Sequence, residues 1–282
     1  MKFASLLALV LVLFLAACGG RKQAKLNVPP PPPISPPTEL PPASSTEPAT
    51  QPNAKAPKAE EPSQGRSAES ETSADKERAD DERAEEDEQK LAHAVPEDAV
   101  PLEVQTGIAS WYGPPYHNRR GSNGEIYNMN DMTAAHLTLP LGTIVRVTNL
   151  KTGSTALVRI TDRGPFVKGR LIDLSLAAAK RLDVWRAGLA EVKLEVLKSP
   201  ASLDAGGRWA VQIGAFEKEK PARDLAGHLE RRYHSAKVLC FGSPMGDWWV
   251  RVRVLDDNRA RAKELAQATK TSEGAIFLVR LD

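Results

Sequence analysis

The chain has 282 residues, enough for two ordinary domains, but the distribution of proline and charge excludes a chain folded along its whole length. Thirteen of its 22 prolines lie within residues 29–62, and residues 58–90 hold 13 acidic and 6 basic side chains. The formal charge of +2 conceals two cationic segments, residues 104–198 and 207–282. A cationic surface suits any polyanion, so charge alone does not select a partner.

An export signal opens the chain. Lys2 precedes an apolar run over residues 3–17, which is too short for a comfortable transmembrane helix and is typical of a signal peptide. The run ends in LAAC, which resembles a bacterial lipobox and makes Cys18 the predicted lipidation site and mature N-terminus. Gly19 follows the cysteine, and not Asp, so the resemblance to sorted lipoproteins implies the outer membrane, in its inner leaflet and facing the periplasm. The alternative is a plain signal peptide with an incidental cysteine.

The predicted export signal and the number of cysteines further limit the classes of function that the protein can have. An exported protein is not expected to bind nucleic acid. With Cys18 acylated, Cys240 has no partner for an intramolecular disulfide, and its apolar surroundings predict a small buried hydrophobe. The five histidines show no metal-ligand spacing, so we expect neither a metal nor another cofactor.

Residues 18–103 are predicted to be a disordered tether. The run of five prolines that begins at Pro29 predicts locally stiff polyproline II. Residues 58–90 contain no aromatic residue and cannot bury enough apolar surface to offset chain entropy, so they are predicted to be a solvated acidic tract.

Residues 104–198 have the texture of a small β domain. Short segments rich in β-branched residues alternate with glycine-containing turns, and Ser175 can cap a short helix over residues 177–182. One helix among many strands predicts a small barrel. The predicted strands cover residues 107–112, 143–148, 156–161, 170–174 and 191–197.

A second domain is predicted over residues 208–282, after a linker at 199–207 that contains proline and glycine. Its segments alternate as strand, helix, strand, strand, helix, strand, the order of a ferredoxin-like sheet with both helices on one face. These segments are residues 209–216, 222–233, 237–241, 248–255, 259–268 and 275–281.

Three groups capable of proton transfer lie at predicted turns of the first domain. Asp162 directly follows a strand, so its carboxylate is expected at the barrel rim, where desolvation can raise its pKa to suit a general acid. Glu125 follows an Asn-Gly turn, and His136 ends the segment MTAAH. His136 can tune a carboxylate or bind a sugar hydroxyl, and a structural role is the alternative. For Asp162 the alternatives are pairing with Arg163 and capping of a turn.

Aromatic and polar side chains near these groups are candidate substrate contacts. Trp111, Tyr112 and Tyr116 can form a wall for sugar rings, or can simply pack the barrel. Asp173 is either a site residue or the cap of the helix that follows it.

Alternation predicts a binding face in the second domain. Gln212, Trp249, Arg251 and Arg253 would share the face of the sheet opposite the helices, if the even positions of residues 248–254 face the helices.

Several motifs in order carry a family resemblance. GIASWYG, SNGE, MTAAH, LPLGTIVRVTN, TDRGPF and GRLIDLS, between residues 107 and 179, resemble the rare lipoprotein A family. WAVQIGAF at residues 209–216, with the element order that follows, resembles a SPOR domain. The resemblance implies a double-psi β-barrel that acts on cell-wall glycan, and a module that binds septal peptidoglycan stripped of stem peptides. It also matches Glu125 to a functional glutamate.

Part of the barrel departs from the family pattern. In the segment that holds His117 and Arg120, the residues Asn118, Gly121 and Ser122 replace residues that are commonly Gly, Thr and Ala. The length of the segment is unchanged, so the catalytic geometry is expected to be kept while substrate contacts there differ.

The resemblance implies an endolytic peptidoglycan lytic transglycosylase at the division septum, with septal division proteins as possible partners. Such an enzyme cleaves the MurNAc–GlcNAc β-1,4 bond and leaves a 1,6-anhydroMurNAc end. We expect Asp162 to be the acid/base, with Glu125 second and His136 in support; exchanged roles for the two carboxylates are the alternative. A non-catalytic wall-binding lipoprotein is the main rival, because fold does not fix function, and a hydrolase that uses water is the other.

Overall fold

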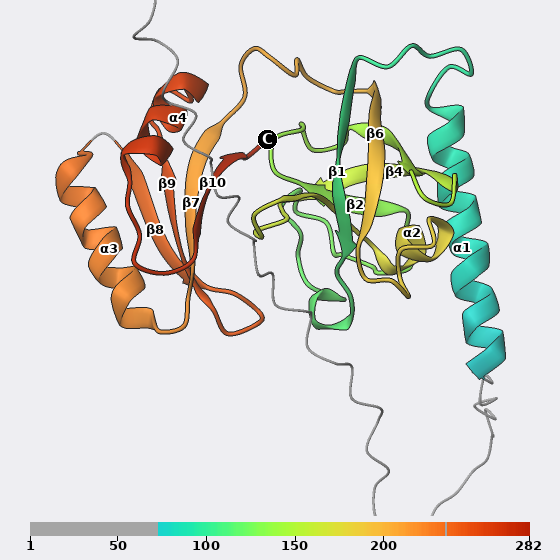
Figure 1. Ribbon diagram of the computed structural model, residues 1–282, viewed down its shortest axis with the longest axis horizontal. Helices are drawn as coiled ribbons and strands as arrows, with labels where there is room; N and C mark the ends of the chain where they lie inside the picture. Colours follow the sequence, from blue (N-terminus) through green and yellow to red (C-terminus); the bar gives the residue numbers. More distant parts are fainter. Residues whose placement is uncertain (1–72, 235) are drawn as a thin grey trace, which may run out of the picture. The chain divides into compact units, whose positions relative to one another are not determined.

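The computed structural model describes residues 73–234 and 236–282. In chain order these residues form a helix, a closed six-stranded barrel and a domain with a four-stranded sheet (Figure 1). The predicted signal peptide, the lipidation site Cys18 and the proline-rich part of the tether lie outside the described residues.

The barrel confirms the predicted fold class of the first domain. Its strands close in the order β1-β5-β2-β4-β3-β6, and the pairs β1–β5 and β2–β4 are parallel while the others are antiparallel. A 3-10 helix, η1 (Pro114–Tyr116), follows β1, and α2 (Leu176–Arg181) follows β5. The strands are β1 (Glu103–Trp111), β2 (Thr133–His136), β3 (Ile144–Asn149), β4 (Thr155–Asp162), β5 (Arg170–Leu174) and β6 (Ala190–Lys198).

Alternation along the strands fills the barrel interior. Every second residue of β3, β4 and β6 joins one hydrophobic core, as the period of two in a strand requires. Among the core residues are Val145, Val147, Ala156, Val158, Ile160, Val192, Leu194 and Val196.

Strand β2 is the barrel strand that the sequence does not reveal. All four of its residues are buried, so the apolar–polar alternation that identifies the other strands is missing here. Its position is nonetheless central, because β2 pairs in parallel with β4 and antiparallel with β5. It therefore joins the strand that ends in Asp162 to the strand that carries Asp173.

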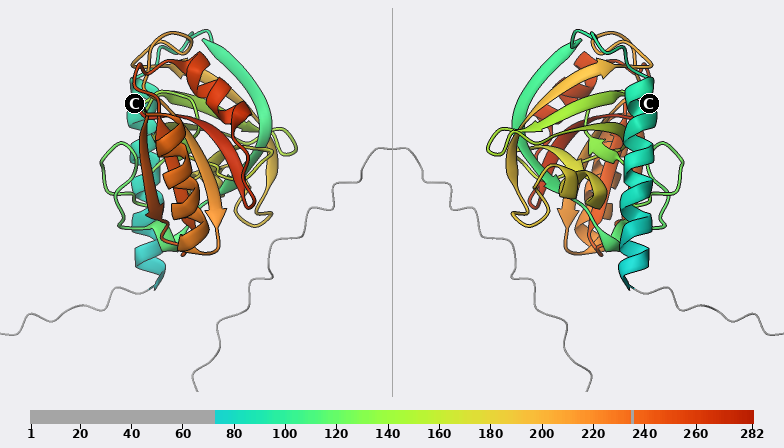
Figure 2. Two further views of the ribbon diagram at one scale, coloured as in Figure 1. Left: turned by 90° about the vertical axis from the view of Figure 1, so that its left-hand side faces the viewer. Right: turned by 90° about the vertical axis from the view of Figure 1, so that its right-hand side faces the viewer.

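The C-terminal domain confirms the predicted order βαββαβ. Its antiparallel sheet has the strand order β10-β7-β9-β8. Helices α3 and α4 cover one face of this sheet (Figures 1 and 2), where Trp209, Val211, Val250 and Val252 form the core. The elements are β7 (Trp209–Phe216), α3 (Glu219–Arg232), β8 (Lys237–Gly242), β9 (Trp248–Arg253), α4 (Arg259–Ala268) and β10 (Ala275–Arg280). Cys240 is free, and it packs partly buried against this core.

Helix α1 (Ser73–His93) corrects the prediction for the end of the tether. Residues 73–90 were expected to be a solvated acidic tract, but in the structure they are helical and lie along the barrel (Figures 1 and 2). Ala84 and Leu91, seven residues apart on one helix face, pack against the barrel core. The helix is held by two apolar contacts and by the attraction between its acidic side chains and the cationic barrel. The composition of residues 58–90 reveals neither interaction, which is why the sequence predicts disorder here.

Polar contacts fix α1 in register on the barrel. Glu88 accepts hydrogen bonds from the backbone N–H of Leu157, at 3.1 Å, and from Arg181 Nε, at 2.8 Å. Asn130 donates to Asp80 at 2.6 Å, and Arg83 pairs with Asp131.

Candidate active site

Strand β4 ends in Asp162, and the loop of residues 118–127 folds over that end. Asp162 Oδ1 accepts hydrogen bonds from Ser122 N at 3.0 Å, Ser122 Oγ at 2.5 Å and Arg163 N at 2.7 Å. The half-buried carboxylate is thus held in place by three donors. The alternative in which Asp162 pairs with the Arg163 side chain is not observed, because the Arg163 guanidinium donates to the His136 and Asp282 carbonyls.

The loop owes its shape to short polar contacts. Asn123 Oδ1 accepts from Glu125 N at 3.0 Å, an Asx turn of the kind that the sequence Ser-Asn-Gly-Glu favours. Gly124 has φ of +88°, a conformation that L side chains rarely adopt, and Gly121 N donates to Glu125 O at 2.8 Å. The sequence pattern therefore explains why Ser122 and Glu125 are presented on one loop.

Glu125 lines the same surface hollow as Asp162 but is committed to an ion pair. Arg159 donates from its two terminal nitrogens to the two oxygens of Glu125, at 3.2 and 2.9 Å. The hydrogen bond from Arg159 is the largest influence on the pKa of Glu125 and lowers it. Glu125 is therefore suited to carry a fixed negative charge and poorly suited to donate a proton near neutral pH. The hollow is lined by Gly121, Asn123, Glu125, Ile126, Tyr127, Asn128, Asp131, Thr133, Arg159, Thr161 and Asp162.

His136 lies in the barrel wall and not at an open surface. It is 3% exposed, and its Nδ1 accepts from the backbone N–H groups of Thr138 and Leu139 at 3.2 and 3.0 Å. Burial, with the nearby Arg163 charge, lowers the pKa of His136 to about 3. The ring is therefore neutral around pH 7 and holds the turn after β2, which supports the structural alternative for this residue.

Asp173 projects from the middle of β5 and is half-buried. Its Oδ1 accepts a short hydrogen bond from Ser110 Oγ on β1, and Arg170 donates to the same serine at 3.2 Å. Burial raises the pKa of the Asp173 carboxyl, against the opposing effects of Ser110 and Arg170. It does not cap α2, because Ser175 Oγ accepts from Ala178 N at 3.2 Å in that role. Of the two roles open to Asp173 from sequence, the cap is excluded.

The two aspartates lie in one row across the barrel wall. Ala135 of β2 is in register with Asp162 of β4 on one side and with Asp173 of β5 on the other, and Asp173 is in register with Ser110. Residues in register on neighbouring strands project to the same face of a sheet. Ala134 and Ile172, the neighbours of Ala135 and Asp173 along their strands, belong to the barrel core, so Ala135 and Asp173 face outward. The register of β2 and β4 shifts between Ala134 and Ala135, and this irregularity brings Asp162, two residues after the core residue Ile160, level with Ala135.

Tyrosines lie beside this row of residues. Two members of the predicted aromatic wall, Tyr112 and Tyr116, are among them. Tyr112 stacks on Tyr127 with ring centroids 4.4 Å apart, and the Tyr116 ring meets Tyr112 edge-on at 5.8 Å. Burial raises the pKa of Tyr112, and the charges of Asp162 and Asp173 add to the effect, as they do for Tyr116. Trp111 instead packs against the barrel core. Tyr127 was missed from sequence, although an aromatic residue two positions after Glu125 was an available signal.

The expected face of the C-terminal sheet is observed, but part of it is covered. The even positions of β9, Val250 and Val252, pack with the helices, so Trp249, Arg251 and Arg253 project from the opposite face. Gln212 and Trp249 are only 2% and 7% exposed. Trp249 packs with Phe277 and with Phe166 of the barrel, whereas Arg251 and Arg253 are half-exposed.

Gln212 is held by its neighbour on this face. Its Oε1 accepts from Arg251 Nε and Arg251 NH2 at 3.0 and 2.6 Å, and Arg253 pairs with Asp257 at 2.9 Å. A glycan would therefore meet the arginines first, and Gln212 only through a change at Arg251.

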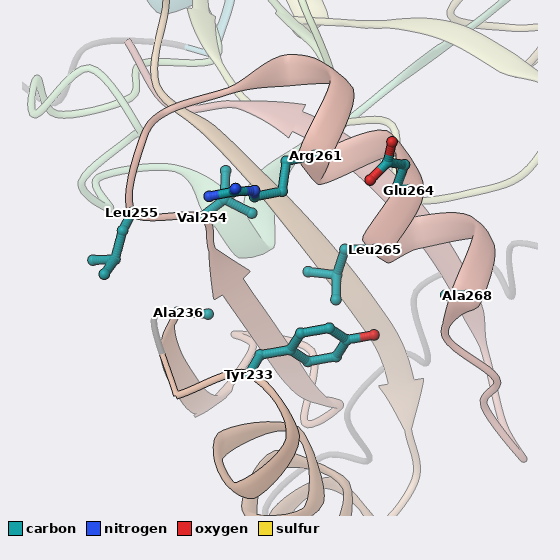
Figure 3. Close-up of a pocket in the computed structure, with 8 residues that line it drawn as sticks. All are labelled: Tyr233, Ala236, Val254, Leu255, Arg261, Glu264, Leu265 and Ala268. Carbon is teal, nitrogen blue, oxygen red and sulfur yellow. The ribbon is translucent and has the colours of Figure 1, made fainter.

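A separate hollow of the C-terminal domain contains none of the predicted catalytic groups. In Figure 3 the Tyr233 ring and Leu265 face each other across it, and α4 contributes Arg261 and Glu264. Within residues 73–234 and 236–282, no group of three or more His, Cys, Asp or Glu side chains could hold a metal ion. In the same part of the chain, no helix is long and apolar enough to cross a membrane.

Comparison with known proteins confirms the predicted resemblance. Residues 104–194 match the family model described as lytic transglycolase, with a double-psi barrel, and residues 205–278 match the SPOR domain. The chain thus carries both modules in the expected order and is similar to proteins of the rare lipoprotein A family.

Individual relatives carry names that agree with the match to the lytic transglycolase model. An endolytic peptidoglycan transglycosylase RlpA from Campylobacter jejuni is 42% identical over 159 residues, covering 47% of this chain and 58% of the relative. One from Helicobacter pylori is also 42% identical, over 47% of this chain and 52% of the relative. The chain therefore spans about half the length of the curated relatives it matches. Among solved structures, a Streptomyces papain inhibitor covers 36% of this chain and all of its own, at 21% identity and a TM-score of 0.29, a likeness too low to support a conclusion.

Proposed function

We propose that the protein is an endolytic peptidoglycan lytic transglycosylase that cleaves the MurNAc–GlcNAc β-1,4 bond and leaves a 1,6-anhydroMurNAc end. The observation that carries this proposal is the outward row of the barrel, where Asp162 and Asp173 flank the small residue Ala135 among tyrosines. The match of residues 104–194 to the lytic transglycolase model, and the printed names of the relatives, support the same activity.

The reaction needs a proton donor and then a proton acceptor. The donor protonates the glycosidic oxygen as the C1–O bond of MurNAc breaks, and the acceptor takes the proton of the C6 hydroxyl as O6 bonds to C1. No water is consumed, unlike in ordinary glycoside hydrolysis. In the single-carboxyl form of the reaction, Asp162 performs both steps, and Glu125, kept ionised by Arg159, supports the positive charge that develops on the sugar.

The substrate is proposed to be glycan that has lost its stem peptides, at the division septum. The SPOR match at residues 205–278 supports binding of such strands, with Arg251 and Arg253 as the accessible groups of the sheet face. Purified protein should release soluble fragments from peptide-free strands faster than from intact sacculi. No fragment from either substrate would favour the alternative of a non-catalytic wall-binding lipoprotein.

Attachment to the outer membrane through Cys18 is part of the proposal. It is motivated by the LAAC sequence at the end of the apolar N-terminal run. Cys18→Ser removes the sulfur that forms the thioether, so the variant should lose incorporation of a labelled fatty acid and leave the membrane fraction. Equal labelling of variant and wild type would refute the lipid anchor.

A further inference from the structure

We infer that Asp173 is the proton donor of the proposed reaction, so that two carboxylates divide the work and Asp162 acts as the base. This inference rests on the proposed function and adds a catalytic residue to it. The geometry points to Asp173 because the groups suggested by sequence as partners of Asp162 are otherwise engaged: Glu125 is paired with Arg159, and His136 is buried in the barrel wall.

The two aspartates differ in their surroundings, and such a difference can separate the roles of acid and base. Asp162 accepts three hydrogen bonds on one carboxylate oxygen at the edge of an exposed loop. Asp173 has one hydroxyl donor, from Ser110, and burial raises its pKa, which favours its protonated form. A group that starts the reaction protonated can act as donor, and one that starts ionised can act as acceptor.

The strand register places the pair suitably for one sugar. They lie on strands β4 and β5, separated only by β2, so their Cα atoms are about 10 Å apart at ordinary strand spacing. The residue between them is Ala135, and no larger side chain stands there. In MurNAc the leaving oxygen and C6 project from the same face of the ring, so two carboxylates on one outward row can reach both.

Glycine at position 164 keeps the approach to Asp173 narrow but open. A Cβ at Gly164 would lie 3.4 Å from the Ala135 Cβ and 3.5 Å from Asp173 Oδ2. A side chain at position 164 would therefore lie in contact with both Ala135 and the Asp173 carboxylate and would occupy space beside them.

The proton balance closes without a co-reactant. Asp173 gives its proton to the glycosidic oxygen as the C1–O bond breaks, and Asp162 receives the proton of the C6 hydroxyl as the O6–C1 bond forms. The enzyme then holds Asp173 ionised and Asp162 protonated, and exchange with solvent restores the starting state.

A substrate with an activated leaving group separates the roles. The 4-nitrophenyl β-glycoside of a GlcNAc–MurNAc disaccharide carries a phenolate leaving group that needs little protonation. Asp173→Asn should lower cleavage of peptide-free glycan by on the order of a hundredfold or more, and should lower release of nitrophenol far less. Asp162→Asn should lower both, because its base is needed with either substrate.

The pH profile supplies a readout that a structural role would not move. Activity should fall at high pH as Asp173 ionises. Ser110→Ala removes a hydrogen bond that lowers the pKa of Asp173, so the alkaline limb should move to higher pH. Arg170→Gln removes a charge that acts in the same direction and should give the same shift. The titratable and charged groups around Asp173 are Arg170, Tyr112, Tyr116, Tyr127 and Asp162.

The outcomes also separate this inference from the proposed function. Circular dichroism and thermal melting first establish whether Asp173→Asn is folded. If this variant is unfolded, the pH profile of Ser110→Ala alone tests the role of Asp173. Wild-type cleavage of glycan with an unchanged Asp173→Asn rate, or an alkaline limb unmoved in Ser110→Ala, would overturn the inference and leave the proposed function standing. Absence of cleavage by the wild type itself would overturn the proposed function.

Discussion

At the scale of single residues, the site depends on how the loop of residues 118–127 presents acceptors and donors to Asp162. The sequence predicts the carboxylate at a strand end, and the structure adds the donors: Ser122 and the backbone of Arg163. Ser122 is one of the positions where the sequence departs from its family pattern, and it contacts the proposed catalytic group directly. A hydroxyl there is therefore expected to affect catalysis as well as substrate contact.

We predict that Asp162→Asn abolishes glycan cleavage while the protein stays folded. The amide has nearly the shape of the carboxylate but cannot take a proton, and loss of general acid–base catalysis costs on the order of 10²–10⁴-fold. Glu191→Gln, an exposed carboxylate of β6, is the matched control and should leave cleavage unchanged. Wild-type turnover in Asp162→Asn would show that the proton passes through another group.

The buried histidine predicts a dependence of stability on pH. Burial lowers the pKa of His136 to about 3, from an ordinary value near 6.5. Between these values only the unfolded chain binds the proton, so the free energy of unfolding is full above pH 6.5 and falls by about 1.4 kcal/mol for each unit below it. His136→Asn can keep an acceptor for the Thr138 and Leu139 amides, and should remove this contribution to the slope.

Urea unfolding between pH 4 and pH 7 measures that slope directly. Other groups add their own pH dependence, so the comparison is the difference between wild type and His136→Asn at each pH. If the difference in the free energy of unfolding between wild type and His136→Asn stayed the same from pH 4 to pH 7, His136 would bind its proton equally in the folded and the unfolded protein.

At the scale of elements, the sequence predicts most of the fold because most elements carry a clear period. Strand β5 is predicted with the bounds it has, and all six elements of the C-terminal domain appear in the predicted order. Strand β2 is not predicted, because its four residues are all buried and show no alternation. Helix α1 is not predicted, because the acidic composition of its segment gives no sign of the two apolar contacts it makes with the barrel. The same holds for the candidate site. The sequence predicts Asp162 because it directly follows a predicted strand, whereas its alignment with Asp173 depends on β2 and on the strand register, which the sequence does not predict.

We predict that Glu88→Ala destabilises the folded protein, because it removes the acceptor of both the Leu157 amide and Arg181. Loss of such a partner should lower the free energy of unfolding by about 1–3 kcal/mol. Glu85→Ala, at an exposed position of the same helix, is the control and should have a much smaller effect. Equal melting temperatures for the two variants would mean that α1 does not dock on the barrel in solution.

At the scale of the whole molecule, one chain carries two modules, and the proposed chemistry belongs to the first. The carboxylates of the proposed site all lie within residues 104–198, and the arginines proposed to contact glycan lie in the second module. The structure also joins the modules: Arg163 donates to the Asp282 carbonyl at 2.7 Å, and Phe166 packs against Trp249 and Phe277. The second module is therefore expected to support the barrel mechanically as well as to direct it.

Deleting residues 208–282 should remove the protein from division sites while the barrel still cleaves peptide-free glycan. Loss of the binding module lowers the effective concentration of substrate but leaves the carboxylates in place. Because the deletion also exposes Phe166, the truncated barrel should melt at a lower temperature than the full chain. Imaging of a fluorescent fusion tests the first effect, and septal enrichment that persists without residues 208–282 would refute the targeting role. A folded but inactive barrel would show that catalysis needs both modules.

The most direct test of the central claim is the source of the new oxygen at the cleaved end. Peptide-free glycan is incubated with the purified protein in ¹⁸O-labelled water, and the masses of the products are measured by mass spectrometry. Ring closure by the C6 hydroxyl predicts anhydro-ended fragments that contain no ¹⁸O. Reducing ends that carry one ¹⁸O would identify a hydrolase and contradict the account.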